Sequence, residues 1–171
     1  VEPISSERPS PNTRGASGLP RYAIDTWGKL FSTRQLLDHA TFVLRIRELP
    51  VPLAQAGYSA KWQEAISAYS AAALSRLADR ENVICTWQSN AEQVNHAFAR
   101  YVLPISWDYA ELNPLADTSG GFGQAVGWVA QVIDHLLIAC SVGGEPEVIA
   151  ASAVGSAFEG FDAIVTDPPY Y

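Results

Sequence analysis

"YSAKWQEAISAYSAAALSRLADR", residues 58 to 80, carries the clearest helical pattern of the chain and decides the fold class. Apolar side chains recur every three or four residues over about six turns, which is the spacing of one face of an α-helix. The stripe consists of Trp62, Ala65, Ile66, Tyr69, Ala73 and Leu77. Several of the other residues are alanine, which has the highest intrinsic helix propensity. We therefore predict a long helix here and a mainly α fold around it.

The preceding stretch, "FSTRQLLDHATFVLRIRELP" at residues 31–50, predicts a first amphipathic helix. Ser32 or Thr33 can cap its N-terminus, because a hydroxyl accepts a hydrogen bond from a free backbone N–H of the first turn. Pro50 is expected to end it, since proline lacks the N–H that a helix interior needs. The residues at helical spacing are Leu36, Leu37, Ala40, Val43, Leu44 and Arg47.

A third helix is predicted in "SNAEQVNHAFARYVLP", residues 89–104. Ser89 stands three residues before Glu92, the spacing of a capping box in which each side chain satisfies the other's free backbone donor. The apolar residues that would then face the core are Val94, Phe98 and Tyr101.

A fourth helix is predicted in "GFGQAVGWVAQVIDHLLIAC", residues 121–140, closed by Gly143 and Gly144. Its apolar residues at helical spacing are Trp128, Val129, Val132, Ile133, Leu136 and Leu137. "GGFGQAVG" at 120–127 also contains a Gly-x-Gly pair, but no apolar strand precedes it. It is therefore interpreted as the flexible start of the helix and not as a cofactor loop.

The period of the pattern changes at the end of the chain. "EVIAAS" (147–152) and "FDAIVT" (161–166) are short apolar runs rich in Val and Ile, typical of strands buried on both faces of a parallel sheet. We expect a four-helix segment followed by two short β-strands that belong to an incomplete Rossmann-like sheet. A buried strand needs neighbours to pair its backbone groups. These neighbours are expected in a missing half of the parent protein or in a second copy, as a homodimer through unpaired strands.

Composition divides the chain into three parts. Residues 1–20 are rich in Pro, Gly and Ser and predict a flexible lead-in, residues 21–143 a helical domain, and residues 144–171 the strand part. The formal net charge is -7, from 11 Lys+Arg against 18 Asp+Glu, so the chain alone is not expected to grip a phosphate backbone. The chain begins at Val1 and contains no Met, from which we expect a fragment of a larger protein.

The expected compartment is the cytoplasm. We expect no membrane contact, because no apolar run in the sequence is expected to approach the ~18 residues of a membrane span and no secretory signal pattern is seen. The two cysteines, Cys85 and Cys140, are too few for a cysteine-based zinc site or a disulfide framework and are expected as reduced, buried small hydrophobes. His39, His96 and His135 stand singly, so no metal is expected.

The final strand pattern runs directly into Asp167, Pro168, Pro169 and Tyr170, followed by Tyr171. An Asp before two prolines can simply form a rigid turn. Its place after a buried strand favours a ligand site, because open parallel sheets bind ligands at the carboxyl ends of their strands. The motif resembles the active-site motif of S-adenosylmethionine-dependent amino-methyltransferases, most typically adenine-N6 DNA methyltransferases.

This resemblance implies a role for each residue of the motif. The Asp167 side chain and the Pro168 carbonyl would accept hydrogen bonds from the target amine, and Pro169 would keep the turn rigid. Tyr170 would stack on the flipped-out base, and Tyr171 would extend that aromatic surface. The target is expected to be DNA, bound through the full-length protein.

Three longer segments extend the resemblance: residues 21–37, 104–122 and 127–136. They are similar to parts of the large prokaryotic adenine-specific DNA methylases that carry a zinc ribbon. The resemblance implies that the helical domain is an insertion between the cofactor half and the strand with the motif. The family's Phe-x-Gly-x-Gly cofactor loop is missing after any strand here and is expected upstream of Val1. The fragment alone is therefore predicted to bind S-adenosylmethionine poorly and to be inactive.

Trp107, Asp108 and Asn113 concentrate aromatic and polar groups in one stretch and are candidates for lining the base or cofactor pocket. The alternative is structural, with a buried Trp and an Asp or Asn that caps a turn.

Three other functions remain open. The first is the same chemistry on cytosine N4, RNA or a protein amide, and the second is a helical protein-protein or substrate-recognition module without catalysis. The third is a helical protein in which the Asp-Pro-Pro-Tyr turn arose by chance. For a recognition module, residues 145–171 are expected to be disordered or swapped into a neighbour.

Overall fold

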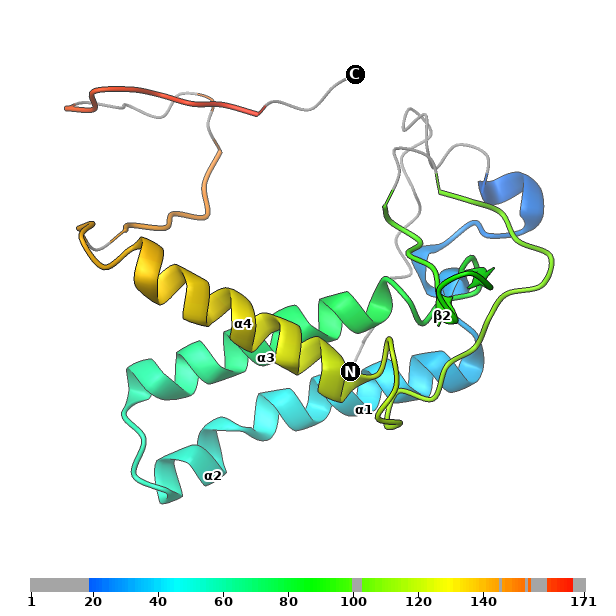
Figure 1. The fold of residues 1–171 in the computed structure, drawn as a ribbon, viewed down its shortest axis with the longest axis horizontal. Helices are drawn as coiled ribbons and strands as arrows, with labels where there is room; N and C mark the ends of the chain where they lie inside the picture. The colour runs from blue at the N-terminus through cyan, green and yellow to red at the C-terminus, as the bar shows by residue number, and fades with distance from the viewer. Residues whose placement is uncertain (1–18, 100–102, 145, 153, 155–159, 168–171) are drawn as a thin grey trace.

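The structure is a computed structural model that describes residues 19–99, 103–144, 146–152, 154 and 160–167. Helices dominate these residues, which confirms the mainly α expectation (Figure 1). In chain order the elements are the 3-10 turns η1 (Leu19–Tyr22) and η2 (Trp27–Leu30), the helices α1 (Thr33–Glu48), α2 (Pro50–Gln55) and α3 (Ala60–Ala78), the strands β1 (Trp87–Gln88) and β2 (Gln93–Val94), and α4 (Phe122–Ala139).

Helix α1 begins where the sequence predicts. The Ser32 hydroxyl accepts a hydrogen bond from the Gln35 N–H at 3.3 Å, and Gln35 Oε1 accepts one from the Ser32 N–H at 2.8 Å. This reciprocal pair is a capping box, so Ser32 is confirmed as the cap. The predicted end at Pro50 is only partly correct, because α1 ends at Glu48 and Pro50 begins the short helix α2, a first-turn position that tolerates proline.

The face that α1 buries is not the apolar stripe noted in the sequence. Gln35 and His39 are its buried residues, whereas 67% of Leu37 is exposed. The reason is that this end of α1 packs against the turn after α3, where the ring nitrogen Nε2 of His39 lies 3.1 Å from the carbonyl oxygen of Glu81. A polar partner across the interface selects a polar helix face.

Helix α3 is confirmed as the longest helix of the described residues, and it contacts α1, α2 and α4. Figure 1 shows α4 crossing α3 and α1 running beside it. At its C-terminal half Ala73 and Leu77 are buried, while 62% of Trp62 near its start is exposed. Only part of the predicted stripe is therefore covered.

The predicted third helix is wrong. Residues 87–94 form a small antiparallel hairpin in which Trp87 pairs with Val94 and Gln88 with Gln93. Glu92 lies in the turn with φ +48°, a left-handed conformation that a helical capping box does not allow. The next backbone donors are satisfied by distant partners instead of a helix, since the Asn95 N–H donates to the Thr86 carbonyl at 2.8 Å.

The main hydrophobic core lies beside the helices, where the two 3-10 turns meet the hairpin. Its buried members are Leu19, Leu30, Ile84, Cys85, Val94 and Ala97. Cys85 is buried as predicted, and burial raises the pKa of its thiol to about 11. Cys140 is exposed, so that half of the expectation is wrong.

Residues 146–152 and 160–167 form no strand among the described residues, which corrects the prediction of two β-strands. Figure 1 shows this part of the chain as an extended trace that runs apart from the helices. Its apolar side chains are exposed, with 92% of Val148 and 95% of Val165 accessible to solvent. The physical reason is that no neighbouring strand lies beside them in the described part of the chain.

Helix α4 corrects the expectation about membrane-length segments. It has 18 residues and is long and apolar enough to cross a membrane, by length and composition only. Ala125 is the one residue of α4 that is buried within the described part of the chain. The cytoplasmic location stays a prediction.

Candidate functional site

Asp167 lies at the exposed end of the extended segment. The rest of the motif, Pro168, Pro169, Tyr170 and Tyr171, lies outside the described residues. The structure therefore places the predicted acceptor carboxylate but describes no pocket around it.

The other predicted contact residues lie together on one surface stretch. Trp107 is 88% exposed, and its ring meets the edge of Tyr22 with 6.4 Å between centroids. Asp108 is exposed, and its backbone carbonyl accepts a hydrogen bond from the Ser106 hydroxyl. The burial predicted for Trp107 in the structural alternative is wrong.

Asn113 has the turn-capping role considered for it. Its Oδ1 atom accepts a hydrogen bond from the Leu115 N–H at 3.0 Å, as in an Asx turn. Neither Asn113 nor Trp107, Asp108 or Asp167 lines the cavity described below.

A polar network that the sequence did not reveal joins the end of α3 to the hairpin. His96 Nδ1 lies 2.5 Å from Asp79 Oδ2, and its Nε2 lies 2.9 Å from an Arg80 NH2 nitrogen. Because Arg80 can only donate, Nε2 accepts, and Nδ1 carries the proton toward Asp79. Asp79 Oδ1 also accepts a hydrogen bond from the Phe98 N–H at 2.8 Å. Both ring nitrogens of His96 thus take part in hydrogen bonds, and the network joins the hairpin to the end of α3.

A second polar cluster lies between α1 and the turn after α3. Glu81 is 1% exposed, and neither of its carboxyl oxygens makes a hydrogen bond of good geometry with the described residues. His39 Nε2 lies 3.6 Å from Glu81 Oε2. Burial, followed by the neighbouring Asp38 carboxylate, raises the pKa of Glu81 to about 8. Burial also lowers the pKa of His39, so both groups are neutral near pH 7.

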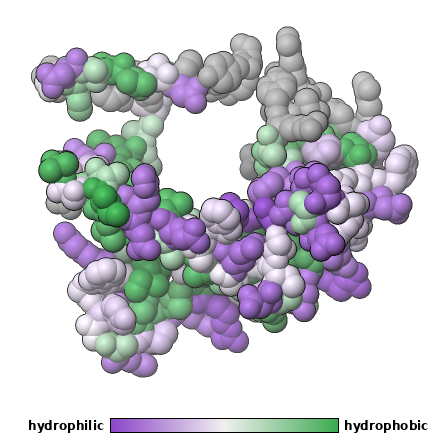
Figure 2. Space-filling model, viewed as in Figure 1, coloured by the Kyte–Doolittle hydropathy of each residue, from purple (hydrophilic) through white to green (hydrophobic). Residues whose placement is uncertain are grey.

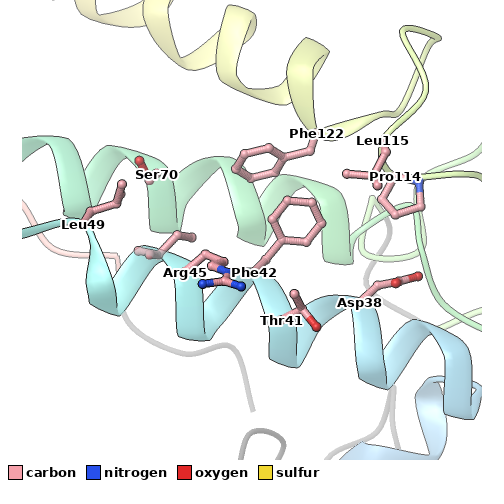
Figure 3. A pocket seen from close by; sticks show the side chains of 10 residues that line it. Asp38, Thr41, Phe42, Arg45, Leu49, Ser70, Pro114, Leu115 and Phe122 are labelled. Atoms are coloured by element: carbon pink, nitrogen blue, oxygen red, sulfur yellow. The ribbon is translucent and has the colours of Figure 1, made fainter. Parts of the chain in front are cut away.

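Asp38 also lines a cavity between α1, α3 and the start of α4 (Figure 3). The cavity has a volume of about 410 Å³, within the range of small-molecule sites. The rings of Phe42 and Phe122 face each other in it, with 4.4 Å between centroids and 31° between planes. The other residues that line the cavity are Thr41, Arg45, Ile46, Leu49, Ser70, Pro114 and Leu115.

The described residues contain no group of three His, Cys, Asp or Glu side chains placed to hold a metal ion. Gly120 has φ +101°, and a Cβ on Gly121 would collide with the Ala116 carbonyl oxygen, so both glycines are required by the turn that starts α4. The interpretation of this stretch as the start of a helix is confirmed, since α4 begins at Phe122.

Comparisons with protein-family models, curated proteins and solved structures returned no match. The resemblance to adenine-specific methylases therefore remains a hypothesis that rests on the motif and the segments quoted from the sequence.

Proposed function

We propose that this chain is the helical domain and the catalytic-motif segment of an S-adenosylmethionine-dependent amino-methyltransferase that acts on adenine N6 of DNA. The observation that carries this proposal is the Asp-Pro-Pro-Tyr motif at 167–170, which directly follows the apolar run 161–166. A carboxylate and a carbonyl can accept hydrogen bonds from an aryl amine, and an aromatic side chain can stack on the ring that carries it.

The chemistry requires that the amine be held and oriented. In this proposal the Asp167 carboxylate and the Pro168 carbonyl accept hydrogen bonds from the two N–H groups of the amine, which directs the nitrogen lone pair away from them. Tyr170 stacks on the extruded base, and Pro169 limits the motion of the turn. Trp107 offers a further exposed ring for contact with the substrate.

The cofactor and the remainder of the sheet have to come from elsewhere. S-adenosylmethionine would supply the activated methyl group, and the glycines before α4 belong to the turn that starts this helix. The exposed side chains of Ile164 and Val165 support the need for sheet partners, because such residues are normally covered in a sheet. A missing half of the protein or a second copy would cover them.

Methyl transfer to DNA tests this function directly. We expect the full-length protein that carries this sequence to transfer label from S-adenosylmethionine to adenine, and Asp167→Ala to reduce the rate by at least about 100-fold, as for loss of an essential polar contact. Asp162→Ala is the matched control, because Asp162 is an exposed acid of the same segment outside the motif. An Asp167→Ala enzyme as active as the control would contradict the assignment.

Transfer to RNA or to cytosine N4 by the same residues is the closest alternative, and the same label assay with those substrates distinguishes it. A non-catalytic recognition module is the second candidate. The observation that favours it is that large apolar side chains of α3 and α4 are exposed, among them Trp62, Leu137 and Ile138. Figure 2 shows hydrophobic residues at the surface near the end of α4. The recognition module is favoured if the full-length protein transfers label to neither DNA nor RNA.

A further inference from the structure

We propose that the cavity between α1, α3 and the start of α4 binds a small organic amine with an apolar body, whose ammonium group pairs with the Asp38 carboxylate. This site is separate from the motif at Asp167 and goes beyond the proposed methyl transfer.

The walls of the cavity suit an apolar or aromatic body. Phe42 of α1 and Phe122 of α4 pack against each other, with 4.4 Å between ring centroids, and form one aromatic wall of the cavity. Ile46 and Leu49 continue the apolar surface along α1. Aromatic faces also attract cations, because the ring carries negative charge above its plane. A ligand with a hydrocarbon end and a positive end matches both features.

The charges at the cavity favour a cation over an anion. Asp38 is half-buried and is the one acid among the lining residues, while Arg45 is the one base. The Arg45 side chain is 75% exposed and already pairs with Glu48, at 2.9 Å between NH1 and Oε2. The enclosed charge is therefore negative, and the positive charge is at the solvent side with its own partner.

Glu81 strengthens this preference from behind Asp38. It is almost fully buried, neither of its oxygens makes a hydrogen bond of good geometry with the described residues, and its nearest acid is Asp38. Because Glu81 is neutral near pH 7 and carries no positive charge, it does not neutralise the Asp38 carboxylate. An ammonium group bound at Asp38 supplies that positive charge, which an alcohol or a carboxylate of the same size does not.

Three probes with the same phenyl body test the inference. We expect the full chain, titrated by calorimetry without any methyl donor, to bind 2-phenylethylammonium more tightly than 2-phenylethanol and phenylacetate least. Asp38→Asn should weaken the binding of the ammonium probe about tenfold, the effect of losing one charge-assisted hydrogen bond, and leave the alcohol nearly unchanged. Asp134→Asn, which removes an exposed acid of α4 that does not line the cavity, should change neither affinity.

The probe series on the unmodified chain is informative even if the Asp38 variant fails to fold. Equal binding of the ammonium and the alcohol, tighter binding of phenylacetate, or no binding of any probe overturns the inference. So does an Asp38→Asn variant with native helical circular dichroism and full affinity for the ammonium. None of these results depends on whether the protein methylates DNA.

Discussion

Glu81 holds a carboxyl group in a place with almost no access to water. It faces the Asp38 carboxylate and the His39 ring from α1, and Glu111 adds a further negative charge from the stretch before α4. Arg34 forms a salt bridge with Glu111 at the surface. Among the described contacts, no cation pairs with Glu81 itself. The neutral acid is consequently the stable form of Glu81 in the folded protein.

The stability of the protein should therefore depend on the proton of Glu81. Its pKa is raised from 4.5 to about 8 on folding, so the folded state keeps a proton that the unfolded state loses. The free energy of unfolding then falls as the pH rises between these values, by at most about 1.4 kcal/mol per pH unit, and levels off above the folded pKa. The pKa of His39 is lowered from 6.5 on folding, so below pH 6.5 this residue makes the free energy of unfolding rise with pH.

Urea unfolding at several pH values between about 6.5 and 8 separates the contribution of Glu81 to the pH dependence of the free energy of unfolding from that of His39. Glu81→Gln should remove most of the slope, because an amide carries no titrating proton. Glu64→Gln, at an exposed glutamate of α3, should leave it unchanged. A slope that persists in Glu81→Gln would mean that another group retains the proton.

At the scale of elements, the hairpin of β1 and β2 shows how tertiary contacts override a local signal. The Ser89 and Glu92 spacing is suited to a capping box, yet the backbone around it pairs as strands and bonds to Thr86. The Asp79 and His96 contact holds the following segment against the end of α3. These partners lie too far away in sequence for a local pattern to indicate them.

The sign of the change in the free energy of unfolding caused by a glycine substitution distinguishes the hairpin from a helix. Glu92 has a positive φ of 48°, so Glu92→Gly should raise the free energy of unfolding by about 0.5–1 kcal/mol through relief of left-handed strain. Ala91→Gly, beside it and without a positive φ, should lower the free energy of unfolding. If residues 89–104 were helical, both glycines would destabilise the protein, which thermal or urea unfolding would reveal.

At the scale of the whole molecule, the helices and the segment that follows them differ in how they are covered. Every described residue from 146 to 167 is exposed, whereas the helical part has a core of its own. Helix α4 contacts α3, but its residues Val132, Leu136 and Leu137 are exposed. An apolar helix with little coverage normally indicates a surface that another structure covers.

Removing the extended segment should therefore cost little stability. A chain that ends at Gly144 is expected to unfold within about 0.5 kcal/mol of the longer chain, the typical range for changes at exposed positions. A chain that ends at Gly120, and so lacks α4, should be strongly destabilised, because the loss of Phe122 removes the ring that packs against Phe42. A large loss from the first truncation would show that residues 145–171 belong to the stable core.

The sequence by itself determined the helices with a strong local period and the cap at Ser32, because helix hydrogen bonds and caps join residues only a few positions apart. It also supplied the motif at Asp167. Only the tertiary structure decided the hairpin, the polar inner face of α1 and the cavity at Asp38. Their contacts join residues distant in sequence, such as His39 with Glu81 and Phe42 with Phe122. The predicted strands at the end did not form among the described residues, since a strand depends on neighbours that a single segment cannot provide.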